Sequence, residues 1–164
     1  MLVEQEADAA IRAQLNALAF SLVLGPLANP DLAIRLACEL ITRGLDTPAT
    51  VDVAALSYGT PLRDSEPQIR EMLAEQHAPV PDAPASDSEY LSLILRAFAS
   101  GCMPIEDFFV QFYRAAPAWS EQTESERALH RLLADLDDET SPADKAELIA
   151  AMRKIAGGHA KNPA

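Results

Sequence analysis

The sequence predicts an all-α protein, with a C-terminal antiparallel four-helix bundle preceded by a small helical N-terminal module. Apolar residues recur at the three- to four-residue spacing of amphipathic helices along almost the whole chain of 164 residues. No stretch alternates with the period of two that marks a strand. Capping residues, prolines and glycines interrupt the pattern at intervals that suit helices of a few turns.

The N-terminal module is predicted to span residues 1–77 and to begin with two amphipathic helices. The first ends at Gly25. Its apolar face consists of Ile11, Leu15, Leu18, Phe20 and Leu22. The second is capped by Asn29, has Pro30 in its first position and stops at Gly44, a residue type that suits the left-handed position after a helix. We expect its buried stripe to comprise Leu32, Leu36, Leu40 and Ile41.

Two further helices follow in the same module. Thr47 followed by Pro48 repeats the cap-then-proline signature and opens a short helix. Its apolar members are Val51, Val53, Ala54 and Leu56. The fourth helix starts at Asp64 or Ser65, with Pro67 just inside it. It carries the apolar residues Ile69, Met72 and Leu73.

Residues 78–87 change the character of the chain, because three of these ten residues are prolines. Val80 is the only bulky side chain in the stretch, and so many prolines exclude a helix. We interpret the stretch as a semi-rigid linker between two modules. The alternative is a long loop within one domain.

Residues 88–157 are predicted to form the four-helix bundle. Asp87 or Ser88 caps its first helix, which ends near Gly101. This helix packs through Tyr90, Leu91, Ile94, Leu95 and Phe98. The second helix starts at Pro104 and is rich in aromatic residues. It carries Ile105, Phe108, Phe109, Phe112 and Tyr113, and we expect the three phenylalanines to lie in the bundle core.

The third helix of the bundle opens at Thr123, which has capping-box spacing to Glu126. Its apolar residues are Leu129, Leu132, Leu133 and Leu136. Ser141 and Pro142 open the fourth helix. This helix packs through Leu148, Ile149, Met152 and Ile155. Short connections between these helices favour antiparallel neighbours. We expect the tail of residues 158–164 to be disordered.

The chain is strongly acidic, with 25 Asp and Glu residues against 13 Lys and Arg residues and a formal net charge of −12. This charge argues against nucleic acid and anionic membranes as partners, because both repel an acidic surface. It permits a basic protein partner, which an anionic surface steers toward itself. Hydrophobic residues still make up 49% of the sequence, so we expect a folded core and not a disordered acidic tail.

The first 25 residues lack the basic start and apolar centre of a signal peptide. The longest apolar stretch, residues 17–24, is too short to cross a bilayer. We therefore expect a cytoplasmic protein. In that reducing compartment Cys38 and Cys102 are predicted to be buried, inert thiols without a disulfide.

No spacing of polar residues indicates an enzyme, a metal site or a cofactor site. The sequence has no glycine-rich phosphate loop, no nucleophile elbow and no His-Glu-x-x-His motif. Glu126 and His130 lie four residues apart, and we interpret them as a surface contact within one helix. We predict a protein without catalytic activity, cofactor or metal.

Two features are candidates for binding a partner. Tyr113 and Trp119 border a loop, where an aromatic side chain either plugs the bundle or anchors a partner. Acids also gather at the end of the third bundle helix, where the helix dipole disfavours them. This acidic run comprises Asp135, Asp137, Asp138 and Glu139. It is either a binding surface for a basic partner or a solvated loop in which Asp138 or Ser141 caps the last helix.

The region from Glu89 to Ala156 combines hydrophobic spacing with a few placed acids. The pattern includes the apolar run from Tyr90 to Phe98, Gly101, the segment Ile105-Glu-Asp-Phe-Phe109, Phe112-Tyr113, Leu132-Leu133, Leu136-Asp137 and Glu147-Leu148. In these residues the chain resembles the colicin-like immunity proteins of bacteria, of the colicin D type.

The resemblance implies a small four-helix bundle that binds a toxin nuclease, in the colicin D type a tRNA-cleaving ribonuclease, and blocks its active site with acids in place of RNA phosphates. Together with the two aromatic residues, the acids give a predicted partner-binding set of Glu106, Asp107, Tyr113, Trp119, Asp135, Asp137, Asp138 and Glu139. The competing hypothesis is a non-enzymatic helical scaffold or regulator that holds a protein partner through an apolar groove.

Overall fold

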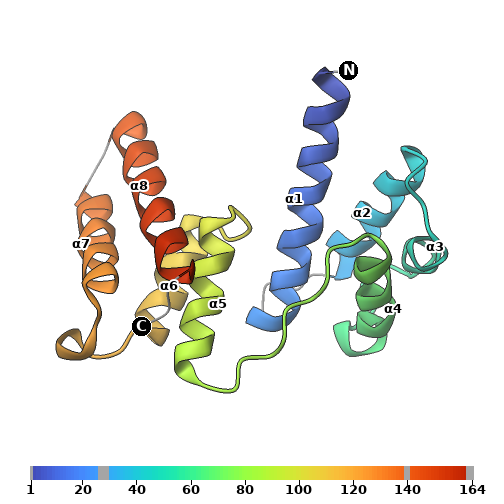
Figure 1. Ribbon diagram of the computed structural model, residues 1–164. Coiled ribbons are helices and arrows are strands. Elements are labelled where there is room, and N and C mark those ends of the chain that lie inside the picture. Colours follow the sequence, from blue (N-terminus) through green and yellow to red (C-terminus); the bar gives the residue numbers. More distant parts are fainter. Residues whose placement is uncertain (1, 26–29, 139–140, 162–164) are drawn as a thin grey trace. The chain divides into compact units, whose positions relative to one another are not determined.

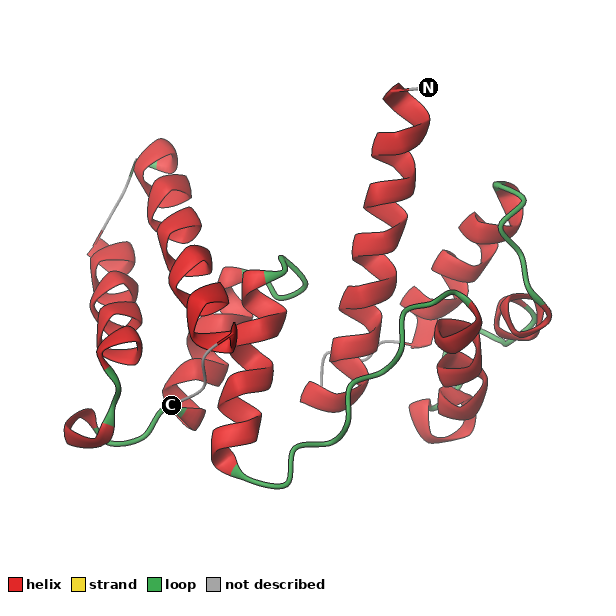
Figure 2. Ribbon diagram, in the orientation of Figure 1, coloured by secondary structure: helices red, strands yellow, loops and turns green. Residues whose placement is uncertain are grey.

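The computed structural model describes residues 2–25, 30–138 and 141–161 (Figure 1). Every regular element within these ranges is a helix, as Figure 2 shows, so the all-α prediction is confirmed. The chain divides into two compact units, Met1–Ala83 and Pro84–Ala164.

The helices of the N-terminal unit are α1 Leu2–Leu24, α2 Pro30–Thr42, α3 Pro48–Ala54 and α4 Leu62–Glu75. α2 packs against the other three, and α3 also packs against α4. Their shared core includes Ile11, Leu15, Leu18, Ala33, Leu36, Ala37, Leu40, Val53, Ile69, Met72 and Leu73. α2 therefore contacts all the other helices of this unit.

The buried face of α2 differs from the predicted stripe. Leu36 and Leu40 are buried as predicted, but Leu32 and Ile41 are 37% and 39% exposed, so the prediction is wrong for those two residues. The face that packs consists of Ala33, Ile34, Leu36, Ala37 and Leu40. Its two alanines allow the neighbouring helices to approach closely, and this turns the larger Leu32 and Ile41 toward solvent. The cap predicted at Asn29 lies outside the described residues.

Local signals set the end of α2 and the start of α3 as predicted. Gly44 has a φ of +69°, and the amide of Leu45 donates to the carbonyl of Leu40 at 2.9 Å, which closes α2 in a Schellman motif. The Oγ1 of Thr47 accepts from the amide of Thr50 at 3.3 Å and caps α3.

α4 begins earlier than predicted. It starts at Leu62 after Pro61, so neither Asp64 nor Ser65 is its cap, and Pro67 lies inside it. Ser65 is fully buried, and its hydroxyl lies within hydrogen-bonding distance of the carbonyls of Pro61 and Leu62, at 3.2 and 3.3 Å. This side chain therefore bonds back to the first turn and does not cap the helix.

Val51 and Cys38 both lie at the surface of the N-terminal unit, and of the two only Cys38 was predicted to be buried. Val51 is 48% exposed on α3. Cys38 is exposed on α2 and Cys102 is partly buried in the C-terminal unit, so the prediction of two buried thiols is wrong, although both thiols are free. Cys38 points outward because its neighbour Ala37 faces the core and successive helical side chains diverge by about 100°.

The N-terminal unit extends into the stretch that was predicted as a linker. α4 closes with His77 at a φ of 56°, and the amide of Ala78 donates to the carbonyl of Leu73 at 2.8 Å. Ala78 is buried, and Val80 packs against the core of the unit. The beginning of residues 78–87 therefore belongs to this core.

The C-terminal unit contains α5 Asp87–Ala99, α6 Ile105–Ala115, the short 3₁₀ helix η1 Trp119–Glu121, α7 Glu124–Asp138 and α8 Pro142–Lys161. α5 packs against α6 and α8, and α7 packs against α8. The core includes Leu91, Ile94, Leu95, Phe98, Phe108, Phe112, Leu129, Leu133 and Met152. Phe98 and Phe108 join α5 to α6 by stacking with ring centroids 3.9 Å apart and planes 11° apart.

α8 continues through Gly157 to Lys161. Residues 158–161 of the predicted disordered tail are therefore helical, and the last three residues lie outside the described part of the chain. A glycine inside a helix costs about 1 kcal/mol relative to alanine. In this part of α8, Gly157 lies against α5, and the Nε2 of His159 lies 3.3 Å from the Oε1 of Glu126 on α7.

Side-chain caps fix the starts of α7 and α8. In the predicted capping box, the Oγ1 of Thr123 accepts from the amide of Glu126 at 3.2 Å, and the Oε2 of Glu126 accepts from the amide of Thr123 at 2.7 Å. The Oγ of Ser141 accepts from the amide of Asp144 at 3.4 Å. Of the two caps considered for the last helix, Asp138 and Ser141, the structure therefore selects Ser141.

The cap of α5 is Ser86, one residue before the predicted Asp87 or Ser88, and its hydroxyl accepts from the amide of Glu89 at 3.2 Å. We expect Ser86→Ala to lower the free energy of unfolding of the C-terminal unit by about 1 kcal/mol, because a helix amide loses its partner. The matched change Ser88→Ala should stay within about 0.5 kcal/mol of the wild type. Urea unfolding followed by the fluorescence of Trp119 measures both, and a larger loss for Ser88→Ala would contradict the assignment.

Candidate functional site

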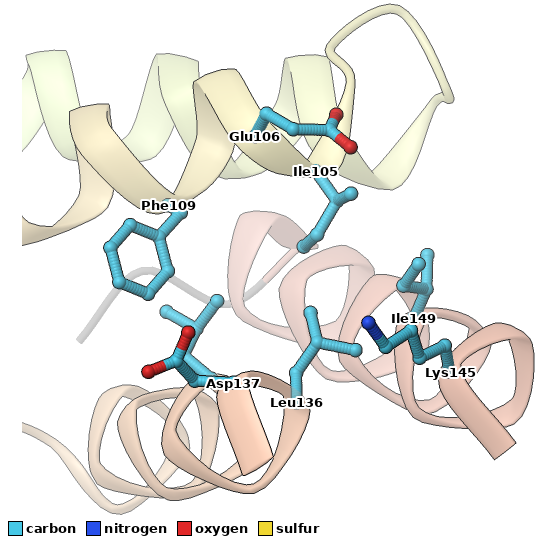
Figure 3. A pocket seen from close by; sticks show the side chains of 8 residues that line it. Ile105, Glu106, Phe109, Leu136, Asp137, Lys145 and Ile149 are labelled. Atoms are coloured by element: carbon cyan, nitrogen blue, oxygen red, sulfur yellow. The ribbon is translucent and has the colours of Figure 1, made fainter. Parts of the chain in front are cut away.

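An open groove lies on the C-terminal unit, between the start of α6 and the facing parts of α7 and α8 (Figure 3). Its volume is about 400 Å³. The lining residues are Ile105, Glu106, Phe109, Leu133, Leu136, Asp137, Lys145 and Ile149. Most of these side chains are apolar, and the three charged ones come from three different helices.

The groove follows from the way in which α6 divides its aromatic residues. Phe108 and Phe112 are fully buried, which turns Ile105 and Phe109 toward the space beside α7. Phe109 is 37% exposed, so its predicted place in the bundle core is wrong in part. α6 packs on α5 and α7 packs on α8, with few close backbone contacts between α6 and α7. The space beside the start of α6 therefore stays open, whereas farther along the helix Tyr113 contacts His130 of α7.

Glu106 and Asp137 give the groove a negative rim. Both residues are exposed, and neither forms an ion pair with another residue in the described part of the chain. Lys145 adds one cation, whose ammonium group lies beside Leu136 in Figure 3, while the Asp137 carboxylate lies on the side of Phe109. This combination suits a partner that offers apolar and basic groups together.

The other predicted acids do not join this groove. Asp135 lines a separate acidic hollow between α7 and α8. It lies two residues before Asp137, and this spacing turns the two side chains roughly 200° apart around the helix axis. Asp107 and Asp138 line neither hollow. Glu139 lies outside the described residues. Of the predicted acidic run, Asp137 therefore lines the groove and Asp135 lines the other hollow.

Tyr113 and Trp119 converge on His130 at the surface of the C-terminal unit. Their ring centroids lie 4.7 and 5.3 Å from that of His130, in edge-to-face geometry. Tyr113 is 41% and Trp119 47% exposed, so neither plugs the core. The guanidinium of Arg131 lies 5.8 Å from the centroid of the Trp119 ring, a cation–π contact. Half-exposed Tyr and Trp beside Arg are the residue types that most often anchor protein partners.

Glu126 and His130 do not form the predicted surface contact. Glu126 is only 5% exposed and bonds with Thr123 at the start of α7, where it also approaches His159. His130 instead lies among the aromatic rings. Because Glu126 caps α7, its side chain points toward the N-terminus of α7 and away from His130.

Sequence reasoning did not assign Lys145 or His130 to any site. A signal existed for the α6 side of the groove, because Ile105, Phe109 and Tyr113 lie four residues apart and share a face distinct from that of the buried phenylalanines. No such signal marks Lys145, since its position depends on how α8 packs against α7.

Within the described ranges, no three His, Cys, Asp or Glu side chains are grouped closely enough to hold a metal ion. None of the helices in that part of the chain is long and apolar enough to cross a membrane. The chain has no significant match among family models, curated proteins or solved structures.

Proposed function

We propose that this chain is an immunity protein, a cytoplasmic and non-catalytic inhibitor that binds a basic toxin nuclease through its C-terminal unit. The observation that carries the proposal is the open apolar groove with the carboxylates of Glu106 and Asp137 at its rim. Exposed apolar surface bordered by polar groups is typical of protein-binding sites. The nature of the partner comes from the resemblance of residues 89–156 to the colicin-like immunity proteins.

The proposed mechanism is occupation of a basic active site. A ribonuclease holds the phosphates of RNA with Lys and Arg side chains. The carboxylates of Glu106 and Asp137 would take the places of those phosphates, while Phe109 fills an apolar hollow beside them. The net charge of −12 would steer the two proteins together and raise the association rate. Inhibition of this kind needs no chemistry by the inhibitor.

The proposal includes an antiparallel four-helix bundle formed by residues 88–157. The contacts of α5 with α6 and α8, and of α7 with α8, are compatible with such a bundle, as are the short connections between these helices. In that arrangement α6 and α7 are neighbours, and the groove lies along their shared side.

The test measures binding to a toxin encoded beside this protein. We expect the double variant Glu106→Gln/Asp137→Asn to slow association by about tenfold and to flatten the salt dependence of the affinity, because the lost charges lie at the rim of the contact. Asp107→Asn/Asp138→Asn removes the same charge outside the groove and should change association much less. Stopped-flow kinetics at several salt concentrations separates the two variants.

Two outcomes would contradict the proposal. Equal effects of the two double variants would mean that net charge acts without the groove. Unchanged affinity and unchanged salt dependence in Glu106→Gln/Asp137→Asn would remove the carboxylates from the mechanism.

A second candidate function is that of a scaffold or regulator without a basic partner. The exposed aromatic pair Tyr113 and Trp119 favours it, because such side chains bind through apolar contact. Association of this kind is nearly insensitive to ionic strength. Trp119→Ala should then weaken binding by about 2 kcal/mol or more, with no change in the salt dependence.

A further inference from the structure

We infer that the partner segment in the groove is a single amphipathic helix that also covers the aromatic cluster, with a basic residue at the groove end and an acidic residue at the other end. The surface it would cover, the α6–α7 strip, comprises Ile105, Phe109, Tyr113, Trp119, His130 and Leu136. The inference rests on one part of the proposed function, that the groove binds a protein. It does not require that protein to be a nuclease.

The α6–α7 strip is continuous because Phe109 belongs to both of its halves. Phe109 lines the groove, and its ring centroid lies 4.8 Å from that of Tyr113. Tyr113 in turn contacts His130, which contacts Trp119. Phe109, Tyr113 and Trp119 are each between one third and one half exposed. A partner that enters the groove at Phe109 therefore meets the adjoining ring of Tyr113 and, beyond it, those of His130 and Trp119.

The dimensions of the strip suit a helix. From Ile105 to Tyr113 the strip follows α6 for roughly 12 Å, at the helical rise of about 1.5 Å per residue. This corresponds to about two turns of a docked helix, which presents apolar side chains at i, i+4 and i+7 to a groove. A small molecule would need a concave site that buries most of its surface, and this strip is open and elongated.

The charged side chains that contact the strip differ between its two ends. Glu106 and Asp137 lie at the groove end, where the single cation is Lys145 among the lining residues. At the other end Arg131 lies over the ring of Trp119. A helix whose basic end faces Glu106 and Asp137 and whose acidic end faces Arg131 meets opposite charge at both ends of the strip. A uniformly basic helix is repelled by Arg131. The order of charges along the partner helix therefore contributes to specificity.

Three synthetic helical peptides of about 14 residues, with the same leucines at i, i+4 and i+7, serve as probes. The bipolar peptide carries lysines at one end and glutamates at the other, and the other two peptides are uniformly basic and uniformly acidic. Each is labelled with a fluorophore and titrated with the full-length chain by fluorescence anisotropy. We expect the bipolar peptide to bind about five- to tenfold more tightly than the basic one, and the acidic one to bind most weakly.

Charge variants of the protein should act in opposite directions on the peptides. Glu106→Gln/Asp137→Asn should weaken both the bipolar and the basic peptide by about fivefold. Arg131→Gln should weaken the bipolar peptide and strengthen the basic one, while Arg131→Lys keeps the charge and preserves the preference. Asp107→Asn/Asp138→Asn is the matched control and should leave all affinities unchanged.

Apolar contact is tested separately on α6. Phe109→Ser should weaken the bipolar peptide by about tenfold or more, because the lost ring joins the two halves of the strip. Val110→Ser is the matched control, since Val110 is 53% exposed on the same helix and does not line the groove. Circular dichroism checks that both variants keep their helices.

The inference is overturned if no peptide binds, or if the bipolar peptide binds no more tightly than the basic one. Self-association that depends on concentration and is lost in Phe109→Ser would assign the strip to a second copy of the chain, which also overturns it. If Glu106→Gln/Asp137→Asn weakens toxin binding but no peptide binds, this inference is refuted and the proposed function stands. If the peptides bind as expected but the same double variant leaves toxin binding unchanged, the proposed function alone is refuted.

Discussion

Replacing Phe108 by alanine is expected to lower the free energy of unfolding of the C-terminal unit by about 3–5 kcal/mol. Phe108 is fully buried, and its ring stacks on Phe98 at 3.9 Å and lies 5.4 Å from the ring of Phe112. The loss combines the transfer free energy of the ring with a cavity that two rigid neighbouring rings cannot fill. Since the stack joins α5 to α6, the change should loosen the contact between these helices.

Trp119 is the single tryptophan of the chain and lies in the same unit, so its fluorescence during urea unfolding reports this loss. Phe109→Ala is the matched control. Phe109 follows Phe108 on α6 but is 37% exposed, and its truncation should cost only about 1–2 kcal/mol. Equal losses for Phe108→Ala and Phe109→Ala would place both rings in the core and contradict the groove.

Replacing Leu40 by alanine is expected to lower the free energy of unfolding of the N-terminal unit by about 2–5 kcal/mol. Leu40 is fully buried on the central helix of that unit, beside Leu36 and Ala37 in the core. Ile41→Ala is the matched control, because Ile41 is 39% exposed, and it should cost about 1 kcal/mol or less. The sequence predicts the same burial for both, so the contrast tests the orientation of α2 directly.

Far-ultraviolet circular dichroism follows the unfolding of both units, whereas Trp119 reports only on its own. Each unit has its own buried core, so we expect Leu40→Ala to shift part of the dichroism transition and to leave the Trp119 transition in place. A shift of the Trp119 transition by the same amount would show that the two units unfold together.

Helix type and several helix ends were predictable because they depend on residues close in sequence. Gly44 stops α2, Thr47 caps α3 and Thr123 with Glu126 opens α7, as the local patterns predict. The errors at Ser86 and Pro61 are shifts of one to a few residues among several suitable residue types. Which of these residues begins the helix depends on small free-energy differences, and contacts with the rest of the fold determine the outcome.

Burial was harder to predict than helix formation. Both Leu40 and Ile41 fit an apolar stripe, and so do Phe108 and Phe109, because neighbouring helical residues differ by only about 100° in direction. Which member of each pair enters the core depends on the neighbouring helices. For the same reason the spacing of the acids at the end of α7 could not show that Asp135 and Asp137 line different hollows.

By itself, the sequence determined that the chain is helical, where several helices begin or end, and that α6 is rich in aromatic residues and α7 in acids. These properties follow from spacing, caps and composition, which act over a few residues. Only the tertiary structure decided that Glu106, Asp137 and Lys145 line one groove, and that α8 continues past Gly157. Each of these depends on contacts between residues that are distant in sequence, and the free energy of those contacts arises only when the helices pack.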